Sequence, residues 1–432
     1  MILRALTALA ALSFCLPSAA SADTLMDNIV GVTLDENGKV EHFSGLIFDA
    51  DGRITRILHS GEKRPKKIEY RFDGQGRFVI PGIIDSRVSL MRIGYHAMTS
   101  GKDGLPPPRP EDRDVALQKA QRMLAAQGIT AIADMGTSIE DWQTYRRAGD
   151  AGTLYIRVMA YAENVEDMAL IGGPGPTPWL YQDRLRFNGL FLTPGKTGAA
   201  GDTGRATQLR NRMSRASIDN FQVAVAASDS SALDDTLDAI DELKQTYKGE
   251  RRWRLEGIRQ IDPLQAGRAA SDASLATFRF DALEQDMASN PPDPAHMQPW
   301  RSVSNAGVTI AYASGTQAAA PAPFAAMAMA ITRENAAGEP FGGWQPQEKL
   351  TREAALAALT VNGARAGFAE GRFGSLSPGE RADFVMLDRD PMLSSPADLR
   401  GARVLETWIG GARIYVAGQA EAQAIGKEMP GW

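Results

Sequence analysis

Short apolar runs alternate with amphipathic stretches through the middle of the chain. Residues 129–136 form an apolar, β-branched run that predicts a buried strand, residues 139–148 follow as a helix, and residues 154–161 form the next strand. Further strands are predicted at residues 187–192, 221–225, 252–256 and 308–312, and further helices at residues 113–127, 232–244, 323–333 and 351–365. This repeated order predicts an α/β chain built on a (β/α)8 TIM-like barrel over residues 81–365.

The two ends of the chain have a different pattern. After residue 22 come short strands and turns, with a strand at residues 28–34 and a hairpin at residues 46–58 around an Ala-Asp-Gly turn. Near the C-terminus, residues 404–415 read as a strand, a Gly-Gly turn and a second strand. Both ends therefore predict β-structure outside the barrel.

The composition is that of an ordinary soluble globular protein. The chain has 432 residues, of which 44% are hydrophobic and 23% charged, enough for one large barrel and a smaller unit. The formal net charge is −5. Because the chain has no excess of basic residues, its charge does not suggest binding to nucleic acid or to an anionic lipid surface.

Residues 1–22 have the three parts of a secretory signal peptide. Arg4 gives a positive start, the apolar run at residues 5–16 is too short to span a bilayer, and Ala20-Ser21-Ala22 offers a cleavage site. The alternative is an uncleaved anchor. We expect an exported protein, periplasmic or secreted, that has no membrane association after cleavage.

The only cysteine, Cys15, lies inside this segment. The bulky Phe14 before it argues against a lipoprotein cleavage site. A mature chain starting at Asp23 would have neither a disulfide nor a thiolate metal site.

Three motifs identify a family resemblance. The run from Gly76 to Asp85 has the form Gly-x-x-Val-x-Pro-Gly-x-Ile-Asp. Arg254-Leu255-Glu256 differs from the motif Arg-Ile-Glu only at its middle residue. Residues 374–388 read Gly-Ser-Leu-Ser-Pro-Gly-Glu-Arg-Ala-Asp-Phe-Val-Met-Leu-Asp. Together they resemble the amidohydrolase superfamily, and most closely its third amidohydrolase family. The resemblance implies that residues 23–80 and 366–425 form a composite β-sandwich beside the barrel. It also implies hydrolysis of non-peptide C–N bonds with one or two divalent metals such as zinc.

The positions where this family carries its metal ligands and catalytic aspartate hold other residues in this chain. The resemblance places them at Arg87, Ser89, Leu190, Ala226, Gly257 and Gly315. Glycine, alanine and leucine side chains have no donor atom. We therefore predict that the metal centre is lost, that no metal or other cofactor is bound, and that the chain is a pseudoenzyme.

Polar residues near the predicted strand ends define a candidate pocket. They are Asp85, Arg87, Asp134, Lys196, Asp229 and Glu256. One hypothesis is that Arg87 pairs with Asp85 and Glu256 and so replaces the charge of the metal; the alternative is an arginine that reaches solvent. Acid–base chemistry by paired carboxylates among Asp134, Asp229 and Glu256 is a further reading, although strand-end carboxylates are as often structural.

Histidines and loops offer little else. The four histidines are His42, His59, His96 and His296, and only the last two follow loops that could approach the barrel mouth. Gly195-Lys196-Thr197 lacks the glycine spacing of a phosphate-binding loop.

Three functions remain open from the sequence. The chain is an active hydrolase with a rebuilt site, a barrel that binds a small molecule, or a non-catalytic subunit of a complex with an active paralogue. Amidohydrolases often form oligomers, so a homo-oligomer is a further expectation.

Overall fold

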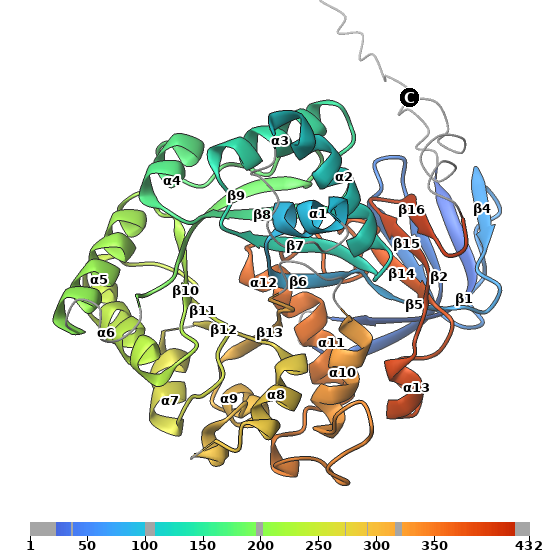
Figure 1. Ribbon diagram of the computed structural model, residues 1–432. Coiled ribbons are helices and arrows are strands. Elements are labelled where there is room, and N and C mark those ends of the chain that lie inside the picture. Colours follow the sequence, from blue (N-terminus) through green and yellow to red (C-terminus); the bar gives the residue numbers. More distant parts are fainter. Residues whose placement is uncertain are drawn as a thin grey trace, which may run out of the picture.

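Two sheets of eight strands each organise the protein. The computed structural model describes residues 23–35, 38–99, 109–195, 202–272, 274–291, 293–315 and 322–419. One sheet curves round and is surrounded by helices, and the other lies beside it (Figure 1). The predicted signal peptide and Lys196 lie outside the described residues. None of the helices in the described ranges combines the length and hydropathy that a membrane-spanning helix needs.

The first sheet is the predicted barrel, and its neighbouring strands are all parallel. In order around the sheet the strands are β6 (Ile83–Val88), β7 (Ile129–Met135), β8 (Arg157–Ala162), β9 (Leu185–Leu192), β10 (Gln222–Ala226), β11 (Arg254–Glu256), β12 (Leu275–Phe278) and β13 (Thr309–Tyr312). Strand β12 was missed by the sequence pattern. The six barrel strands that were predicted, β7 to β11 and β13, are confirmed to within a few residues.

The ring is closed by the main chain that follows β13. The Ser314 N–H donates to Asp85 Oδ1 at 3.0 Å, and the Gly315 N–H donates to the Arg87 carbonyl oxygen at 3.0 Å. These bonds join the last barrel strand to the first, where no ladder pairs β13 with β6 among the described strands.

Helices surround the barrel (Figure 1), and the last of them brings Gly363 against Ile84, an inward-facing residue of the first strand. They are α1 (Leu90–Met98), α2 (Pro110–Ala125), α3 (Ile139–Asp150), α4 (Val165–Gly172), α5 (Asp202–Ile218), α6 (Ser230–Thr246), α7 (Pro263–Ser271), α8 (Leu283–Ala288), α9 (Trp300–Asn305), α10 (Pro323–Thr332), α11 (Arg352–Leu359) and α12 (Val361–Ala366), with 3₁₀ turns η1 (Phe280–Ala282), η2 (Pro294–His296) and η3 (Pro346–Glu348).

The single helix predicted over residues 351–365 is two helices. Thr351 caps the first as expected, with its side chain accepting from the Ala354 N–H at 3.1 Å. At Thr360 the backbone leaves the helical region (φ −134°, ψ −96°), while the Thr360 hydroxyl donates to the Leu356 carbonyl oxygen at 2.7 Å. A threonine that bonds back to the preceding turn commonly bends a helix.

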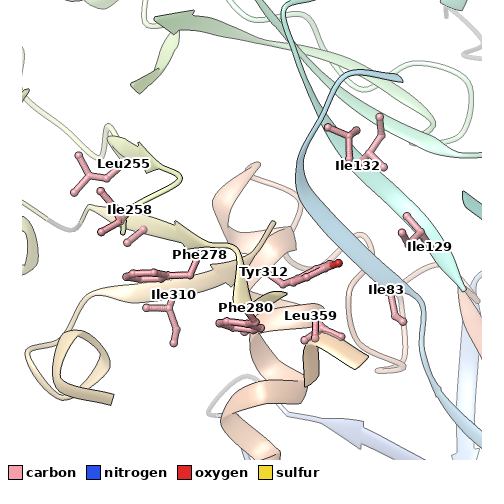
Figure 2. Close-up of a cluster of buried hydrophobic side chains, with 14 of the residues drawn as sticks. Ile83, Ile129, Ile132, Leu255, Ile258, Phe278, Phe280, Ile310, Tyr312 and Leu359 are labelled. Carbon is pink, nitrogen blue, oxygen red and sulfur yellow. The ribbon is translucent and has the colours of Figure 1, made fainter. Parts of the chain in front are cut away.

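Barrel side chains alternate between two apolar clusters. On β7, Ile129 and Ile132 belong to the outer cluster between strands and helices, whereas Ala131, Ala133 and Met135 belong to an inner cluster shared with β6, β8, β9 and β10. Figure 2 shows part of the outer cluster, where side chains of the barrel strands meet Phe280 and Leu359. This two-faced burial holds the strand ends, and therefore the barrel mouth, in place.

The second sheet combines both ends of the chain, as predicted. Its order is β16 (Ala412–Val416), β15 (Val404–Ile409), β14 (Phe384–Leu387), β5 (Phe78–Pro81), β1 (Thr24–Leu34), β2 (Val40–Phe48) and β3 (Ile54–Leu58), with β4 (Tyr70–Asp73) also paired to β1; the short helix α13 (Pro396–Arg400) precedes β15. The N-terminal β5 and the C-terminal β14 are antiparallel neighbours. The Trp408 ring stacks on Phe384 at 5.3 Å in its core. The strands form one mixed sheet by hydrogen bonding.

A buried ion pair fastens this sheet to the barrel. Arg157, the first residue of β8, donates from Nε and Nη2 to Asp383 at 2.5 and 2.8 Å, and neither side chain is more than 2% exposed. Asp383 Oδ1 also accepts from the Gly410 N–H at 2.7 Å. Asp383, which belongs to the motif at residues 374–388, therefore has a structural role and connects the two sheets.

Candidate functional site

The barrel mouth is formed where the strands end. We use this name for the residues at or just after the ends of β6, β9, β11, β12 and β13, namely Arg87, Phe191, Gly257, Arg279 and Gly315. The C-terminal ends of the strands are where barrels of this type place their sites. Three of the predicted former-ligand positions, Arg87, Gly257 and Gly315, meet here.

The Arg87 guanidinium occupies the space above Gly257. A Cβ atom added to Gly257 would lie only 2.3 Å from Arg87 Nη1. Gly257 has φ +66°, in the left-handed region that side chains other than glycine rarely adopt. Both the backbone conformation and the neighbouring arginine therefore exclude a histidine here without rearrangement.

Gly315 repeats this arrangement with a second arginine. Its φ is +62°, and an added Cβ would lie 2.9 Å from Arg279 Cδ. The Arg279 stem thus fills the space that an aspartate at this position would need. Since Gly315 also donates to the Arg87 carbonyl oxygen, it lies between the main chain of one arginine and the side chain of the other.

Arg87 is partly buried and has no carboxylate bonded to its side chain among the described residues. Its guanidinium lies over the Phe191 ring, 5.4 Å from the ring centre. Burial lowers the pKa of Arg87, the Glu256 charge opposes that effect, and the nearby Arg279 and Arg254 charges add to it. The predicted ion pair with Asp85 or Glu256 is not formed: Arg87 bonds to Asp85 through its backbone N–H, at 3.2 Å, and not through its guanidinium.

Glu256 is instead bonded to Arg254 inside the barrel. Arg254 Nε donates to Glu256 Oε1 at 2.6 Å, the Thr277 hydroxyl donates to Oε2 at 2.8 Å, and both ionic side chains have no exposed surface. Arg254 also donates to the Tyr161 hydroxyl at 3.0 Å and to the Ser86 carbonyl oxygen at 2.7 Å. This network fills the barrel beneath the mouth and leaves Glu256 with two protein donors.

Asp85 is fully buried beside β13. Burial raises its pKa to about 7, against the opposing hydrogen bonds from Ser314 and Arg87. Its Oδ2 has no hydrogen-bond partner among the described residues. The carboxyl group is therefore largely protonated at mildly acidic pH.

Replacing Asp85 with asparagine is expected to remove a pH dependence of stability. The folded pKa is above the ordinary 3.8, so the unfolded chain releases its proton first and stability falls as pH rises from about 4 to about 7. Between about pH 5 and pH 7 the wild-type chain should lose roughly 2–3 kcal/mol through this group. Urea unfolding of both proteins across this range measures the difference, and parallel curves would contradict the assignment.

Asp134 and Asp229 have structural roles. Asp134 accepts from the Leu90 N–H at the start of α1, and from the Thr137 and Tyr145 hydroxyls at 2.7 and 2.8 Å. Its side chain points to the helices rather than into the mouth. Asp229 is the N-cap of α6 and accepts from the Ala232 N–H at 2.9 Å. The structure does not bring these carboxylates together as an acid–base pair.

The remaining predicted positions are apolar or weakly bonded. Leu190 belongs to the outer cluster, and the next residue, Phe191, faces the mouth in its place. Ala226 lies in the inner cluster, 8% exposed, and the Ser89 hydroxyl donates to the Met135 carbonyl oxygen at 3.4 Å. Lys196 falls outside the described residues.

The residues present do not fit the family's metal. No group of three or more His, Cys, Asp or Glu side chains able to hold an ion occurs in the part of the chain that the structure describes. His296 bonds to Asp293 at 2.6 Å in the turn η2, His59 lies 3.4 Å from Glu41 beside the second sheet, and His96 is in the last turn of α1. At the mouth, two guanidinium cations stand where the ligand side chains would be.

Sequence reasoning missed Arg279 and Phe191. Arg279 follows β12, the strand that the pattern did not predict, and a basic residue directly after an apolar run was its only signal. The sequence pattern points to Leu190, whereas the inward-facing residue is Phe191. The register of β8 and β9 shifts just before these residues, and this shift reverses which side chains face inward.

Comparison with known proteins agrees with the fold. The model of the Amidohydrolase family matches residues 89–415. The chain is 27% identical over 317 residues to an N-substituted formamide deformylase of Arthrobacter pascens and 25% identical over 341 residues to Protein LONG AFTER FAR-RED 3 of Arabidopsis thaliana. These matches cover 67% and 71% of this chain, and 58% of the length of each relative.

Solved structures share the architecture. An uncharacterized metal-dependent hydrolase from Pyrococcus horikoshii superposes with a TM-score of 0.71 at 16% identity, covering 87% of this chain and 99% of that one. The family match extends over both the barrel and the C-terminal strands. The chain therefore belongs to the amidohydrolase family.

Proposed function

We propose that this member of the amidohydrolase family has lost metal-dependent hydrolysis and uses its barrel mouth to bind a small molecule. The observation that carries the proposal is the pair Gly257 and Gly315, two left-handed glycines whose side-chain space is taken by Arg87 and Arg279. A guanidinium cation at each of these positions opposes a divalent ion electrostatically. The loss of the metal site therefore involves the backbone conformation of the two glycines and the arginines beside them, in addition to the substituted ligand residues.

The nearby carboxylates support the same conclusion. Asp85 and Glu256 have no exposed surface, and Glu256 is already bonded to Arg254 and Thr277. A divalent ion such as zinc needs about four ligands, or three and a water, converging on one point. Recruiting Glu256 would leave the Arg254 charge buried without its partner.

Hydrolysis of a C–N bond is the second candidate function. Family membership and the similarity to an N-substituted formamide deformylase favour it. A non-catalytic role beside an active paralogue is the third, and co-purification of that second polypeptide would identify it. The following measurement separates hydrolysis from binding.

We expect the purified mature protein to contain far less than one zinc, manganese or iron ion per chain. The reason is the absence of a converging donor set around the mouth in the described residues. Elemental analysis after purification without chelators measures it. One or two tightly held ions per chain, with amide hydrolysis that a chelator abolishes, would contradict the proposal.

The metal content and the stability of the variant Gly257→His provide a second test. We expect it to gain no metal and to lose stability, since it combines a strained left-handed backbone, costing about 1–2 kcal/mol, with displacement of Arg87. Gly371→His is the matched control: its φ is +72° and no atom lies within 4 Å of an added Cβ. Because Gly257 is buried and Gly371 is exposed, a larger loss in Gly257→His than in the control measures the added cost of burying the imidazole and displacing Arg87.

A further inference from the structure

Charge is unevenly distributed at the barrel mouth. The Arg87 guanidinium interacts electrostatically with Arg254 and with Arg279, while Glu256 pairs with Arg254 and Asp281 with Arg279. These five groups, three positive and two negative, carry one net positive charge. Asp85 adds little negative charge below neutral pH, because burial raises its pKa to about 7.

The hydrogen-bonding capacity of the two mouth arginines is largely unused. Arg87 has no hydrogen bond from its guanidinium to any described residue, although it is partly buried. Arg279 donates from Nη2 to Asp281 at 3.0 Å, and its Nε is buried without a partner among the described residues. The pair with Asp281 is exposed, with side chains 43% and 49% accessible, so it contributes little. Guanidinium groups held this way are suited to an anionic acceptor.

Apolar side chains form the adjacent wall. Phe191 lies under the Arg87 guanidinium, and Met135 and Ala226 lie in the same inner cluster. Each of the three keeps a small exposed surface of 5–8%, whereas most members of this cluster are completely buried. An apolar group next to the arginines would contact this wall.

We infer that the barrel mouth binds a small organic monocarboxylate, with its carboxylate between Arg87 and Arg279 and its apolar part against Phe191. This inference rests on the proposed function, because a metal at the same place would exclude the two guanidinium groups. A planar carboxylate matches the fork of N–H donors on an arginine. A single net positive charge complements a monoanion better than a phosphate dianion.

The test is titration calorimetry of the mature protein at about pH 6 with acetate, benzoate and phenylacetate, each compared with its neutral amide and with inorganic phosphate. We expect saturable binding of at least one carboxylate, and weaker or no binding of its amide and of phosphate. Arg87→Gln and Arg279→Gln should each weaken carboxylate binding about tenfold or more. Arg87→Lys keeps the charge but loses the fork, so its affinity should lie in between.

Arg210→Gln is the matched control. Arg210 is 39% exposed and pairs with Glu242 on the outer helices, much as Arg279 pairs with Asp281, but it lies away from the mouth. It should bind the carboxylate as the wild-type chain does. Melting temperatures of all variants distinguish lost binding from lost folding.

Three results would overturn the inference. They are absence of saturable binding by every carboxylate, equal binding of the amides or of phosphate, and unchanged affinity in both mouth variants. Metal analysis of the same samples keeps the two proposals separate. Metal-free protein that binds no carboxylate defeats this inference alone, whereas stoichiometric metal defeats the proposed function.

Discussion

Replacing Asp383 with alanine should lower the free energy of unfolding by about 3–5 kcal/mol. The substitution leaves the Arg157 guanidinium charged and almost fully buried, without the carboxylate that accepts from its Nε and Nη2. It also removes the acceptor of the Gly410 N–H. Urea unfolding, followed by tryptophan fluorescence and by circular dichroism, measures the loss.

Asp238→Ala is the control for this prediction. Asp238 pairs with Arg268, but it is 72% exposed, and such pairs contribute about 0–1 kcal/mol. The double variant Arg157→Met with Asp383→Leu should regain most of the loss, because it removes both buried charges together. If Asp383→Ala were no more destabilising than the control, the joint between sheet and barrel would have no energetic importance.

Replacing Glu256 with alanine is expected to be equally costly, about 3–5 kcal/mol, for a related reason. Arg254 would keep its bonds to Tyr161 and Ser86 but lose its only carboxylate partner among the described residues, in a place with no exposed surface. The same denaturation experiment measures the change. Glu242→Ala, in an exposed pair with Arg210, is the control.

This second prediction also tests the role of Glu256. If the carboxylate were held for catalysis or for a metal, its removal would change activity or metal content and leave stability nearly intact, or even raised. A stability loss with no change in metal content agrees with a structural partner of Arg254. Glu256→Ala together with Arg254→Met should recover most of the stability.

The barrel was predictable from sequence because its apolar runs are bounded by turns and helices. Residues 129–136 were expected as a strand and form β7. The four-residue strand β12 escaped because Thr277 is its only β-branched residue, whereas the equally short β13 has both Thr309 and Ile310. The pairing of both chain ends in one sheet followed from the motif at residues 374–388, since the apolar pattern alone gives no long-range partner.

The sequence predicted which positions could belong to the site, but not which of their side chains point into the barrel mouth. In a parallel barrel both faces of a strand are buried, so the apolar pattern does not reveal which residues point inward. For this reason Asp134 was expected at the mouth although it faces α1 and α3, and Leu190 was selected instead of Phe191. The role of Arg279 required the position of β12 beside β13, which is tertiary information.

The second sheet has a consequence for how the chain is synthesised. Strand β5 is flanked by β1 from its own end of the chain and by β14 from the opposite end, and the Arg157 charge has no counter-ion until Asp383 arrives. A nascent chain that ends before Asp383 lacks β14, so one edge of β5 has no partner strand and Arg157 has no carboxylate to bind. Contacts of such large sequence separation form late and slowly, so assembly of the native protein waits for translation to be nearly finished.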